Sequence, residues 1–594
     1  MTELSPIPSL AAEVGGGISL PEAPFRSLGE MIAARAAADP ERAAVRWRSA
    51  SGKWSELSWE KLDEKRRAVA SGLAALGVKR GDTVAVVSHN SAEMLVAELA
   101  VISLGAISAP IFPEYTADVL LYCLADSGAG VCFVGGAAQQ HKIAAARGIE
   151  RIIVLDDQPL PDDPRAIALK QLGGDTNRGS AAHHVPDTVE REDVAFLLYT
   201  SGTTGKPKGV ELTHGNVLSQ QAAVSALWSL SAKDVFLAHL PWHHCFGGVF
   251  ERFTALWHGA LLVLDDSRGR DLSLLLANWA EIKPSVYFAV PKVYGALMGR
   301  SRRDAKARAA VLHPGLRFVF SAAAPLSEEC FRFFEDSGAA VLEGWGLTET
   351  SPVVTMSVPG KPRRSGIVGW PIPGTLVKLA PVADAPQGRG EILVRGPQIM
   401  RGYRQHPAET ARALEGGWFH TGDLGEWTPF GLQLHGRADG VFKLENGERV
   451  SAGDVEARIL ASTPLLEHAV ALGNGQPFVT ALCWIAPGPA RRWLLDRELD
   501  VPASPPELSR VPELRRAIVE ALQAGNLMAG EPFERVTRVG LVSEAPAVGT
   551  GEMTPSLMMV RAVTEQRHAD LLSAMRDGTP HSDVLEIERR TWDR

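Results

Sequence analysis

The stretch from residue 199 to residue 214 constrains the fold of this chain most strongly. It reads Tyr199-Thr-Ser-Gly-Thr-Thr-Gly-Lys-Pro-Lys-Gly-Val-Glu-Leu-Thr-His214. An apolar run over 194–199 predicts a buried strand before it, and apolar residues at helical spacing over 216–230 predict a helix after it. Between them, glycines let backbone N–H groups turn toward an anion, while hydroxyl and ammonium groups add donors and positive charge. The stretch therefore predicts a loop that holds nucleotide phosphates.

This loop is not a Walker A loop, because no Gly-Lys-Ser/Thr follows a Gly-x-x-x-x spacer. It resembles the Ser/Thr-Ser-Gly-Thr-Thr-Gly-x-Pro-Lys-Gly loop of the AMP-forming adenylate superfamily, which contains acyl- and aryl-CoA synthetases, adenylation domains and luciferases. The amino-acid sequence at residues 236–248 and 286–292 is most similar to that of feruloyl-CoA synthase-type and fatty acyl-CoA synthetase members. The resemblance implies that ATP and AMP are bound by Thr200, Ser201, Gly202, Thr203, Thr204, Gly205 and Lys208.

Length and composition limit the class of protein. At 594 residues the chain is too long for one core, which indicates two or more domains. Hydrophobic residues make up 45% and charged residues 22%, as in ordinary soluble globular proteins. The net charge of −8 argues against a nucleic-acid partner. The five cysteines are scattered, which predicts a reduced, cytoplasmic protein. The sequence shows no signal peptide, and no apolar run is long enough to predict a transmembrane segment.

Strands and helices alternate along the N-terminal part of the chain. We expect helices over 28–38, 59–76 and 92–104, and strands over 83–87 and 109–112. This alternation predicts an α/β fold of layered, largely parallel sheets. Near 368–394 the pattern predicts a small β-rich subdomain, and the polar stretch 158–186 predicts a loop.

The resemblance also implies how the chain divides. A large N-terminal AMP-binding domain would span residues 1–436 and carry the phosphate loop with the adenine and acyl pocket. A smaller, mobile α+β lid domain would span residues 437–594. The hinge between them falls near Asp439, where one or two residues can absorb the change in backbone dihedrals.

His244 lies in the segment Phe236-Leu-Ala-His-Leu-Pro-Trp-His-His-Cys-Phe-Gly-Gly248. By itself, a histidine in an apolar run is more often a core residue than a functional one. The segment resembles the family's Leu-Pro-x-x-His motif, which implies that His244 shapes the acyl pocket and acts in the shift between two half-reactions. We expect residues 246–248 and 322–324 to line that pocket, with Ala323 at a position where the family usually has glycine.

The stretch Glu343-Gly-Trp-Gly-Leu-Thr-Glu-Thr-Ser351 is similar to the family's Gly-Tyr-Gly-x-Thr-Glu motif. The resemblance implies that Trp345 and Gly346 hold the adenine ring, on which an indole can stack. It implies that Thr348 bonds the α-phosphate. Glu349 would hold Mg²⁺, a hard cation that prefers carboxylate oxygen.

Three further residues match family positions near the end of the large domain. Asp423, in Thr421-Gly-Asp423, matches the carboxylate that accepts both ribose hydroxyls. Arg437 matches the cation that reaches ribose or phosphate. Lys443 matches a lysine of long-chain acyl-CoA synthetases and carboxylic acid reductases.

Position 558 departs from the family. The family's last motif reads roughly Gly-Glu-Leu-Thr-Pro-Thr-Leu-Lys-Leu-Lys-Arg, and this chain has Gly551-Glu-Met-Thr-Pro-Ser-Leu-Met-Met-Val-Arg561. Met558 replaces the lysine that stabilises charge on the reacting phosphorus as pyrophosphate leaves. Losing one such preorganised charge typically lowers the rate about 100- to 1,000-fold.

Three hypotheses follow from Met558. Another cation, most plausibly Lys443, takes over the charge stabilisation. Alternatively, the chain adenylates poorly but transfers the acyl group of a supplied acyl-adenylate. In the third hypothesis it is a nucleotide-binding pseudoenzyme without ligase activity.

We therefore expect an ATP-dependent ligase that joins a fatty or aryl acid to CoA, with adenylation impaired or rerouted. Its cofactors would be ATP or AMP, Mg²⁺ and CoA, or the phosphopantetheine of a carrier protein in place of CoA. Its substrate partner is a small-molecule carboxylic acid. The sequence leaves the acid, the thiol acceptor and the oligomeric state open.

Overall fold

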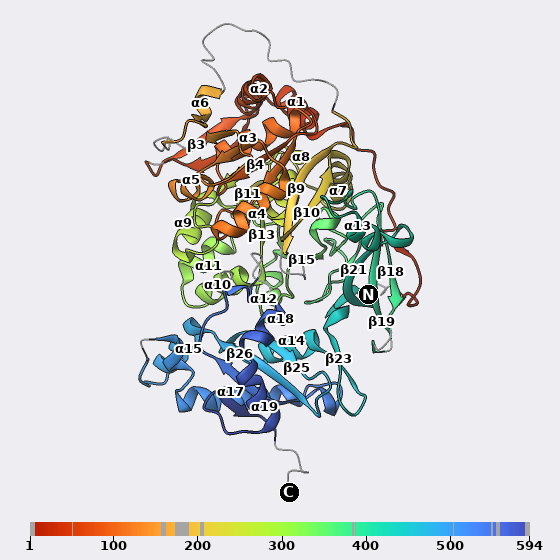
Figure 1. The fold of residues 1–594 in the computed structure, drawn as a ribbon, viewed down its shortest axis with the longest axis vertical. Coiled ribbons are helices and arrows are strands. Elements are labelled where there is room, and N and C mark those ends of the chain that lie inside the picture. The colour runs from red at the N-terminus through yellow and green to blue at the C-terminus, as the bar shows by residue number, and fades with distance from the viewer. Residues whose placement is uncertain are drawn as a thin grey trace. The chain divides into compact units, whose positions relative to one another are not determined.

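The computed structural model describes residues 6–49, 51–155, 162–172, 189–201, 207–382, 385–386, 388–502, 504–547, 550–553 and 559–588. The chain divides into two units (Figure 1). Unit 1 contains Met1–Lys378, Leu393–Thr421 and Thr428–Gln433, and unit 2 contains Leu379–Ile392, Gly422–Trp427 and Leu434–Arg594. The domain boundary at 436/437 and the hinge stay predictions; Asp439 lies in the short 3₁₀ helix η4 (Ala438–Gly440).

Unit 1 is built on two large sheets, which confirms the α/β fold class. The first runs, in spatial order, through β20 (Gly402–Tyr403), β10 (Pro207–Thr213), β9 (Val194–Ser201), β5 (Ile107–Pro110), β4 (Thr83–Val87), β6 (Val131–Val134), β7 (Arg151–Val154) and β8 (Ala166–Ala168). The second runs through β17 (Trp370–Pro371), β16 (Thr355–Met356), β15 (Ala340–Trp345), β14 (Phe318–Ser321), β13 (Val286–Ala289), β11 (Val235–Ala238), β12 (Leu261–Leu264), β2 (Ala43–Arg48) and β3 (Trp54–Ser58).

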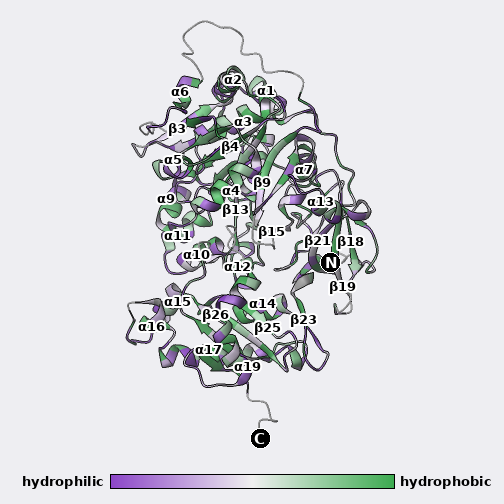
Figure 2. Cartoon of the chain, in the orientation of Figure 1, coloured by the Kyte–Doolittle hydropathy of each residue, from purple (hydrophilic) through white to green (hydrophobic). Residues whose placement is uncertain are grey.

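Helices surround and separate these two sheets. They are α1 (Leu28–Ala38), α2 (Trp59–Ala75), α3 (Ala92–Ser103), α4 (Ala117–Ser127), α5 (Ala137–Ile143), α6 (Leu169–Leu172), α7 (His214–Leu227), α8 (Arg252–His258), α9 (Leu272–Ile282), α10 (Pro291–Ser301), α11 (Ala305–Val311), α12 (Glu328–Glu335) and α13 (Pro407–Ala413). Serine N-caps at Ser27, Ser58 and Ser91 fix the starts of α1, α2 and α3. The largest hydrophobic cluster joins α3, α7 and α8 to strands of both sheets, and Figure 2 shows hydrophobic residues on these inner elements.

A five-stranded sheet forms the small β-rich subdomain. Its order is β1 (Val14–Gly15), β18 (Leu376–Pro381), β19 (Arg389–Arg395), β21 (Phe419–Thr428) and β22 (Gly431–Arg437). Short 3₁₀ helices, η2 (Thr348–Thr350) and η3 (Glu415–Gly417), connect elements of unit 1.

Unit 2 also contains a hairpin and a four-stranded sheet. The hairpin is β23 (Val441–Lys443) with β24 (Arg449–Ser451), and the sheet runs β25 (Leu466–Leu472), β26 (Val479–Ile485), β27 (Val536–Val542) and β28 (Val584–Glu586). The helical elements are α14 (Ala452–Ser462), α15 (Pro487–Leu495), α16 (Pro505–Leu508), α17 (Pro512–Asn526), η5 (Pro532–Glu534), α18 (Arg561–Arg567) and α19 (Ala569–Asp577). One core packs α14 and α17 on this sheet, and a second core packs α19 on it.

The structure differs from the sequence prediction around the phosphate loop. Strand β10 occupies part of the expected loop and pairs antiparallel with β9, so that Lys208 lies opposite Thr200. Helix α7 begins at His214 and ends at Leu227, rather than spanning 216–230, because Thr213 and Asn216 form a capping box at its start. Strand β8 and helix α6 lie within the stretch 158–186, which we predicted as a loop.

A buried ion pair joins the layers of unit 1. The guanidinium of Arg252, at the start of α8, is paired with the carboxylate of Glu98 on α3, and their side chains are 1% and 0% exposed. Ser108 on β5 donates a hydrogen bond of 3.0 Å to the same carboxylate. The Nε of Arg252 donates 2.8 Å to the carbonyl of Gly248, which lies in the π-helix η1 (Phe246–Glu251). The pair thus connects α3, β5, η1 and α8.

Glu98→Ala should destabilise unit 1 by about 3–5 kcal/mol, because it leaves the buried Arg252 charge without its partner. The measurement is the free energy of unfolding in urea. The matched control is Glu56→Ala, which removes an ion pair with Arg46 whose side chains are 52% and 33% exposed. Glu56→Ala should lower the free energy of unfolding by less than about 1 kcal/mol. An equal decrease in the free energy of unfolding for both variants would contradict the account.

Candidate functional site

Glu349 lies in a group of side chains from three separate segments of unit 1. Its carboxylate is buried and accepts a hydrogen bond of 2.8 Å from the hydroxyl of Tyr403. The ammonium of Lys208 lies 5.5 Å from the centre of the Tyr403 ring. Pairing of β10 with β20, with Glu211 opposite Gly402, brings Lys208 and Tyr403 onto adjoining strands. The structure therefore brings two sequence-predicted residues, Lys208 and Glu349, next to the same tyrosine.

Thr348 contacts the segment that contains His244. The Thr348 hydroxyl is buried and donates 3.3 Å to the sulfur of Cys245. Burial raises the pKa of the Cys245 thiol to about 12, so the sulfur stays a neutral acceptor. The α-phosphate motif and the acyl-pocket motif, predicted separately from the sequence, are thus in direct contact.

His244 is a neutral side chain near pH 7. Burial lowers its pKa to about 4. Its Nδ1 accepts a hydrogen bond of 3.2 Å from the backbone N–H of Phe246, which leaves the proton on Nε2. His244 can therefore donate a hydrogen bond from Nε2 without carrying a charge.

The phosphate loop lies partly outside the described residues. Thr200 and Ser201 end strand β9. Gly202, Thr203, Thr204 and Gly205 fall in residues 202–206, between β9 and β10, which lie outside the described residues.

Two glycines flank Trp345, the last residue of β15, because other groups approach their backbone closely. A Cβ at Gly344 would lie 2.5 Å from the ring of Phe320, and one at Gly346 would lie 1.5 Å from the carbonyl oxygen of Pro352. Trp345 itself is buried and pairs with Thr355 of β16. This packing explains the Gly-Trp-Gly order that the sequence showed.

Ala323 adopts a backbone conformation that favours glycine. It is exposed in the loop between β14 and α12, and its φ is +73°. A Cβ is strained in this left-handed region. The position at which the resemblance implies a glycine therefore carries a strained alanine.

Asp423 and Arg437 form an ion pair in unit 2, with Oδ1 and Nη1 3.0 Å apart. The backbone N–H of Gly422 donates 3.1 Å to Glu391. A Cβ at Gly422, whose φ is +68°, would lie 2.5 Å from a guanidinium nitrogen of Arg437. Gly422 thus leaves the space that the Arg437 guanidinium occupies beside Asp423.

Lys443 and Arg561 also lie in unit 2. Lys443 is exposed at the end of β23, and its backbone N–H donates 3.4 Å to Asn474. Arg561 is held by the carbonyl of Ala471 and by the carboxylate of Glu456. Met558 lies outside the described residues. The guanidinium of Arg561 is thus already paired within unit 2.

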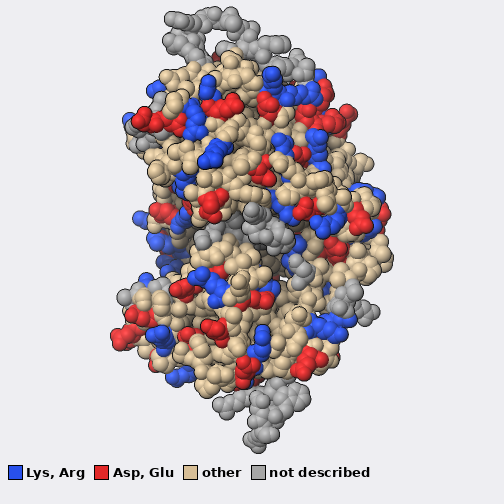
Figure 3. Space-filling view, viewed as in Figure 1, with Lys and Arg blue, Asp and Glu red and all other residues tan. Residues whose placement is uncertain are grey.

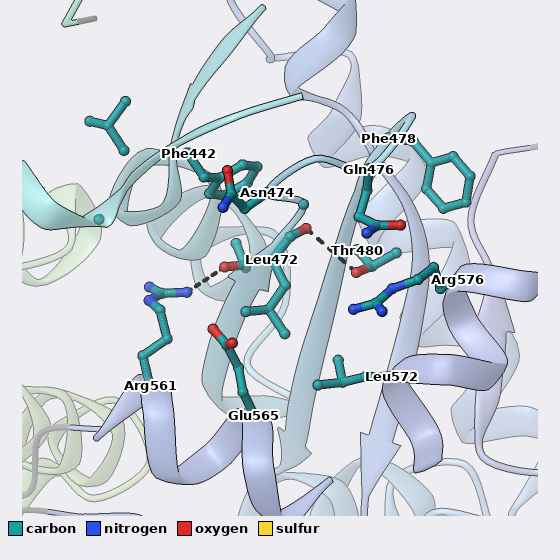
Figure 4. A pocket seen from close by; sticks show the side chains of 14 residues that line it. Phe442, Leu472, Asn474, Gln476, Phe478, Thr480, Arg561, Glu565, Leu572 and Arg576 are labelled. Carbon is teal, nitrogen blue, oxygen red and sulfur yellow. Dashed lines mark hydrogen bonds between the residues drawn. The ribbon is translucent and has the colours of Figure 1, made fainter. Parts of the chain in front are cut away.

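A pocket of about 300 Å³ opens beside Arg561 in unit 2 (Figure 4). Strands β25 and β26 and helices α18 and α19 form its walls, and Figure 4 shows Glu565 and Arg576 directed toward it from the two helices. Phe442 and Leu572 add apolar surface. Figure 3 shows basic and acidic side chains interspersed over the face of the molecule that it draws.

Sequence reasoning missed Tyr403, Cys245 and the role of Glu343. The Glu343 carboxylate accepts N–H bonds from Gly366 at 3.1 Å and from Leu326 at 3.4 Å, and burial raises its pKa to about 7. It thereby ties the Ala323 loop to β15. The only sequence signal for Glu343 was its place at the head of the Gly-Trp-Gly-Leu-Thr-Glu motif; Tyr403 and Cys245 carried none.

The residues present fit a magnesium ion that is shared with nucleotide phosphates. Mg²⁺ usually takes one or two protein carboxylates and completes its shell with phosphate oxygens and water. Glu349 supplies one buried carboxylate, with Lys208 nearby for phosphate charge. Among the described residues, no three His, Cys, Asp or Glu side chains form a metal cluster, so the fit depends on a bound nucleotide.

The sequence profile of the AMP-binding enzyme family matches residues 32–404. The chain belongs to this family. Long-chain-fatty-acid–CoA ligase FadD15 of Mycobacterium bovis is 27% identical, over 88% of this chain and 93% of the relative. Peroxisomal long chain acyl-CoA synthetase 7 of Arabidopsis thaliana is also 27% identical, over 88% of this chain and 82% of the relative.

Two solved structures support the fold. The anthranilate CoA ligase AuaEII in complex with anthranoyl-AMP has a TM-score of 0.75 at 22% identity, with 93% of this chain and 98% of that chain covered. ATP-bound MatB from Rhodopseudomonas palustris has a TM-score of 0.72 at 23% identity, with 92% and 100% covered. Within the part of the chain that the structure describes, no helix has the length and apolar character needed to cross a membrane.

Ala323→Gly should raise the stability of unit 1 by about 0.5–1 kcal/mol, since it removes a Cβ from left-handed backbone. The measurement is the urea midpoint followed by circular dichroism. The matched control is Ala324→Gly, which is also exposed but has no left-handed φ. That control should lower stability by a similar amount through the extra freedom of the unfolded chain. A shift in the same direction for both variants would show that Ala323 is unstrained.

Proposed function

We propose that this chain is an ATP-dependent carboxylic acid–CoA ligase. A carboxylate oxygen of the acid attacks the α-phosphorus of ATP, and pyrophosphate leaves to give an acyl-adenylate. The thiol of the acceptor then attacks the acyl carbon, and AMP leaves as the thioester forms. The observation that carries the proposal is the group of Lys208, Tyr403, Glu349 and Thr348 in unit 1 of an AMP-binding enzyme.

The predicted site residues divide into phosphate, adenine and ribose groups. Thr200, Lys208 and Thr348 would bind the phosphates, together with Ser201 and residues 202–205. Glu349 would hold Mg²⁺, which supplies positive charge to the phosphate oxygens. Ala323, Trp345 and Gly346 would hold the adenine, and Asp423 with Arg437 the ribose and a phosphate.

We propose the chemical class of the acid and of the thiol acceptor rather than one compound for each. Relatives are named for long-chain fatty acids and a structural neighbour holds anthranoyl-AMP, so the acid is fatty or aryl. The acceptor is CoA, with a carrier protein's phosphopantetheine as the alternative. The proposal includes a hinge at Asp439 between a large and a small domain. It also includes a cytoplasmic location, which suits the five buried free thiols.

Met558 favours a second candidate. Without the lysine, the first half-reaction would be slow, whereas transfer from an acyl-adenylate would proceed. Arg561 is held by Ala471 and Glu456, so Lys443, exposed on β23, is the cation we propose as a substitute. If no cation substitutes, the chain is a transferase that uses a supplied acyl-adenylate, or a nucleotide-binding pseudoenzyme.

The test is pyrophosphate release from ATP with fatty and aryl acids. We expect slow release by the wild type and a gain of about 100-fold in Met558→Lys. Thioester formation from a supplied acyl-adenylate should be equally fast in both. The matched control is Met528→Lys, which adds the same charge at a side chain that is 81% exposed and should change neither rate.

Each outcome separates the candidates. Fast wild-type release that collapses in Lys443→Ala would assign the charge to Lys443. No release, with thioester still formed from the acyl-adenylate, would make the chain a transferase. Neither activity, even in Met558→Lys, would contradict the ligase.

A further inference from the structure

The pocket beside Arg561 belongs entirely to unit 2 (Figure 4). Its volume of about 300 Å³ lies at the lower end of the range that small-molecule sites occupy. Among the described residues that line it, none is a residue that we predicted for the nucleotide, the metal or catalysis. The side chains of the pocket therefore have to be read for a ligand of their own.

Two side chains of opposite charge enter this pocket from its two helices. Glu565 of α18 and Arg576 of α19 both line it and are directed toward it in Figure 4. Both are exposed to solvent. Among the described residues, neither has an ion-pair partner, and they do not pair with each other. Each charge is thus available to a bound molecule.

The other cation of the pocket is already paired. The guanidinium of Arg561 donates to the carbonyl of Ala471 and pairs with the carboxylate of Glu456. One positive charge, on Arg576, and one negative charge, on Glu565, then remain for a ligand. A simple anion would be repelled by Glu565 and a simple cation by Arg576. A molecule with one carboxylate and one ammonium group satisfies both through charge-assisted hydrogen bonds.

The same pocket has an apolar surface. Phe442 is half-buried and Leu572 is buried, and both line the pocket. The ring of Phe442 packs over Gly473, where a Cβ would lie 2.5 Å from it. The buried hydroxyl of Thr480 donates 3.4 Å to the carbonyl of Leu472, so its proton is already bonded within the protein. An apolar group of a ligand, above all a ring, can therefore pack on Phe442.

Both helices that carry the charges are attached to the sheet. Arg561 begins α18 and is held by its two partners on β25 and α14. On β27, the Nη1 of Arg538 donates 2.8 Å to the carbonyl of Met575, the residue before Arg576. Met575 is itself fully buried. The backbone at Glu565 and Arg576 is thus fixed before a ligand arrives, which lowers the cost of ordering on binding.

We propose that unit 2 carries an additional ligand site, for an α-amino acid with an apolar side chain. The α-carboxylate pairs with Arg576 and the α-ammonium group pairs with Glu565. The apolar side chain packs against Phe442 and Leu572. This binding goes beyond the ligase reaction and requires neither ATP nor turnover.

Titration calorimetry of the whole chain with L-phenylalanine, in the absence of ATP, tests the proposal. We expect one saturable site with a dissociation constant below about 1 mM. Two analogues each lack one charge: 3-phenylpropionate lacks the ammonium group and 2-phenylethylamine lacks the carboxylate. Each should bind at least about 10-fold more weakly.

Two results of this titration would overturn the inference. They are the absence of L-phenylalanine binding, and equally tight binding of 3-phenylpropionate, which would show recognition of a carboxylate alone. Neither result touches the ligase proposal, because pyrophosphate release tests that proposal separately.

Variants of the two charged residues locate the site. Arg576→Gln and Glu565→Gln change exposed side chains, so the fold is retained, and each should weaken L-phenylalanine binding by about 10-fold. Glu565→Gln should also abolish the preference over 3-phenylpropionate. The matched controls are Arg516→Gln and Glu520→Gln, which are exposed on α17 and outside the pocket and should leave binding unchanged. Unchanged binding in Arg576→Gln or in Glu565→Gln would contradict the inference.

Discussion

The guanidinium of Arg252 is the constraint on which the site in unit 1 depends. Its charge is matched by Glu98 in a part of the core with almost no solvent access. Its Nε donates a hydrogen bond to the Gly248 carbonyl in the π-helix, and its Cζ lies 4.9 Å from the centre of the Trp242 ring. A buried charge of this kind is tolerated only when its partners are fixed. Fixing them also fixes the segment that carries His244.

From this segment the contacts continue to the nucleotide motif. Cys245 receives the Thr348 hydroxyl, and Phe320 covers Gly344. Glu349 accepts a hydrogen bond from the hydroxyl of Tyr403, and the Lys208 ammonium lies over the ring of the same tyrosine. The two motifs that the sequence predicts for the acid and for the nucleotide are thus packed against each other in unit 1. One of them contains the π-helix η1, and π-helical segments are frequent at functional sites.

Local sequence patterns predicted the bounds of several helices and strands, but they did not predict which side chains contact each other. Helix α1 and strand β4 have the predicted bounds, because a serine cap starts the first and a Gly-Asp turn precedes the second. Strand β10 was missed because glycines and lysines dominate its start, and only its pairing with β9 makes it a strand. The motif residues were found by resemblance. The contacts of Tyr403 with Glu349 and of Cys245 with Thr348 could not be predicted in this way. In each contact the two residues are more than fifty positions apart along the chain.

The central claim is that unit 1 holds a nucleotide together with Mg²⁺ through Glu349. Titration calorimetry of the whole chain with ATP, with and without Mg²⁺, tests it most directly. The account predicts one saturable ATP site whose affinity rises with Mg²⁺, and a loss of that rise in Glu349→Gln. Absence of ATP binding, or an equal Mg²⁺ effect in Glu349→Gln, would contradict it.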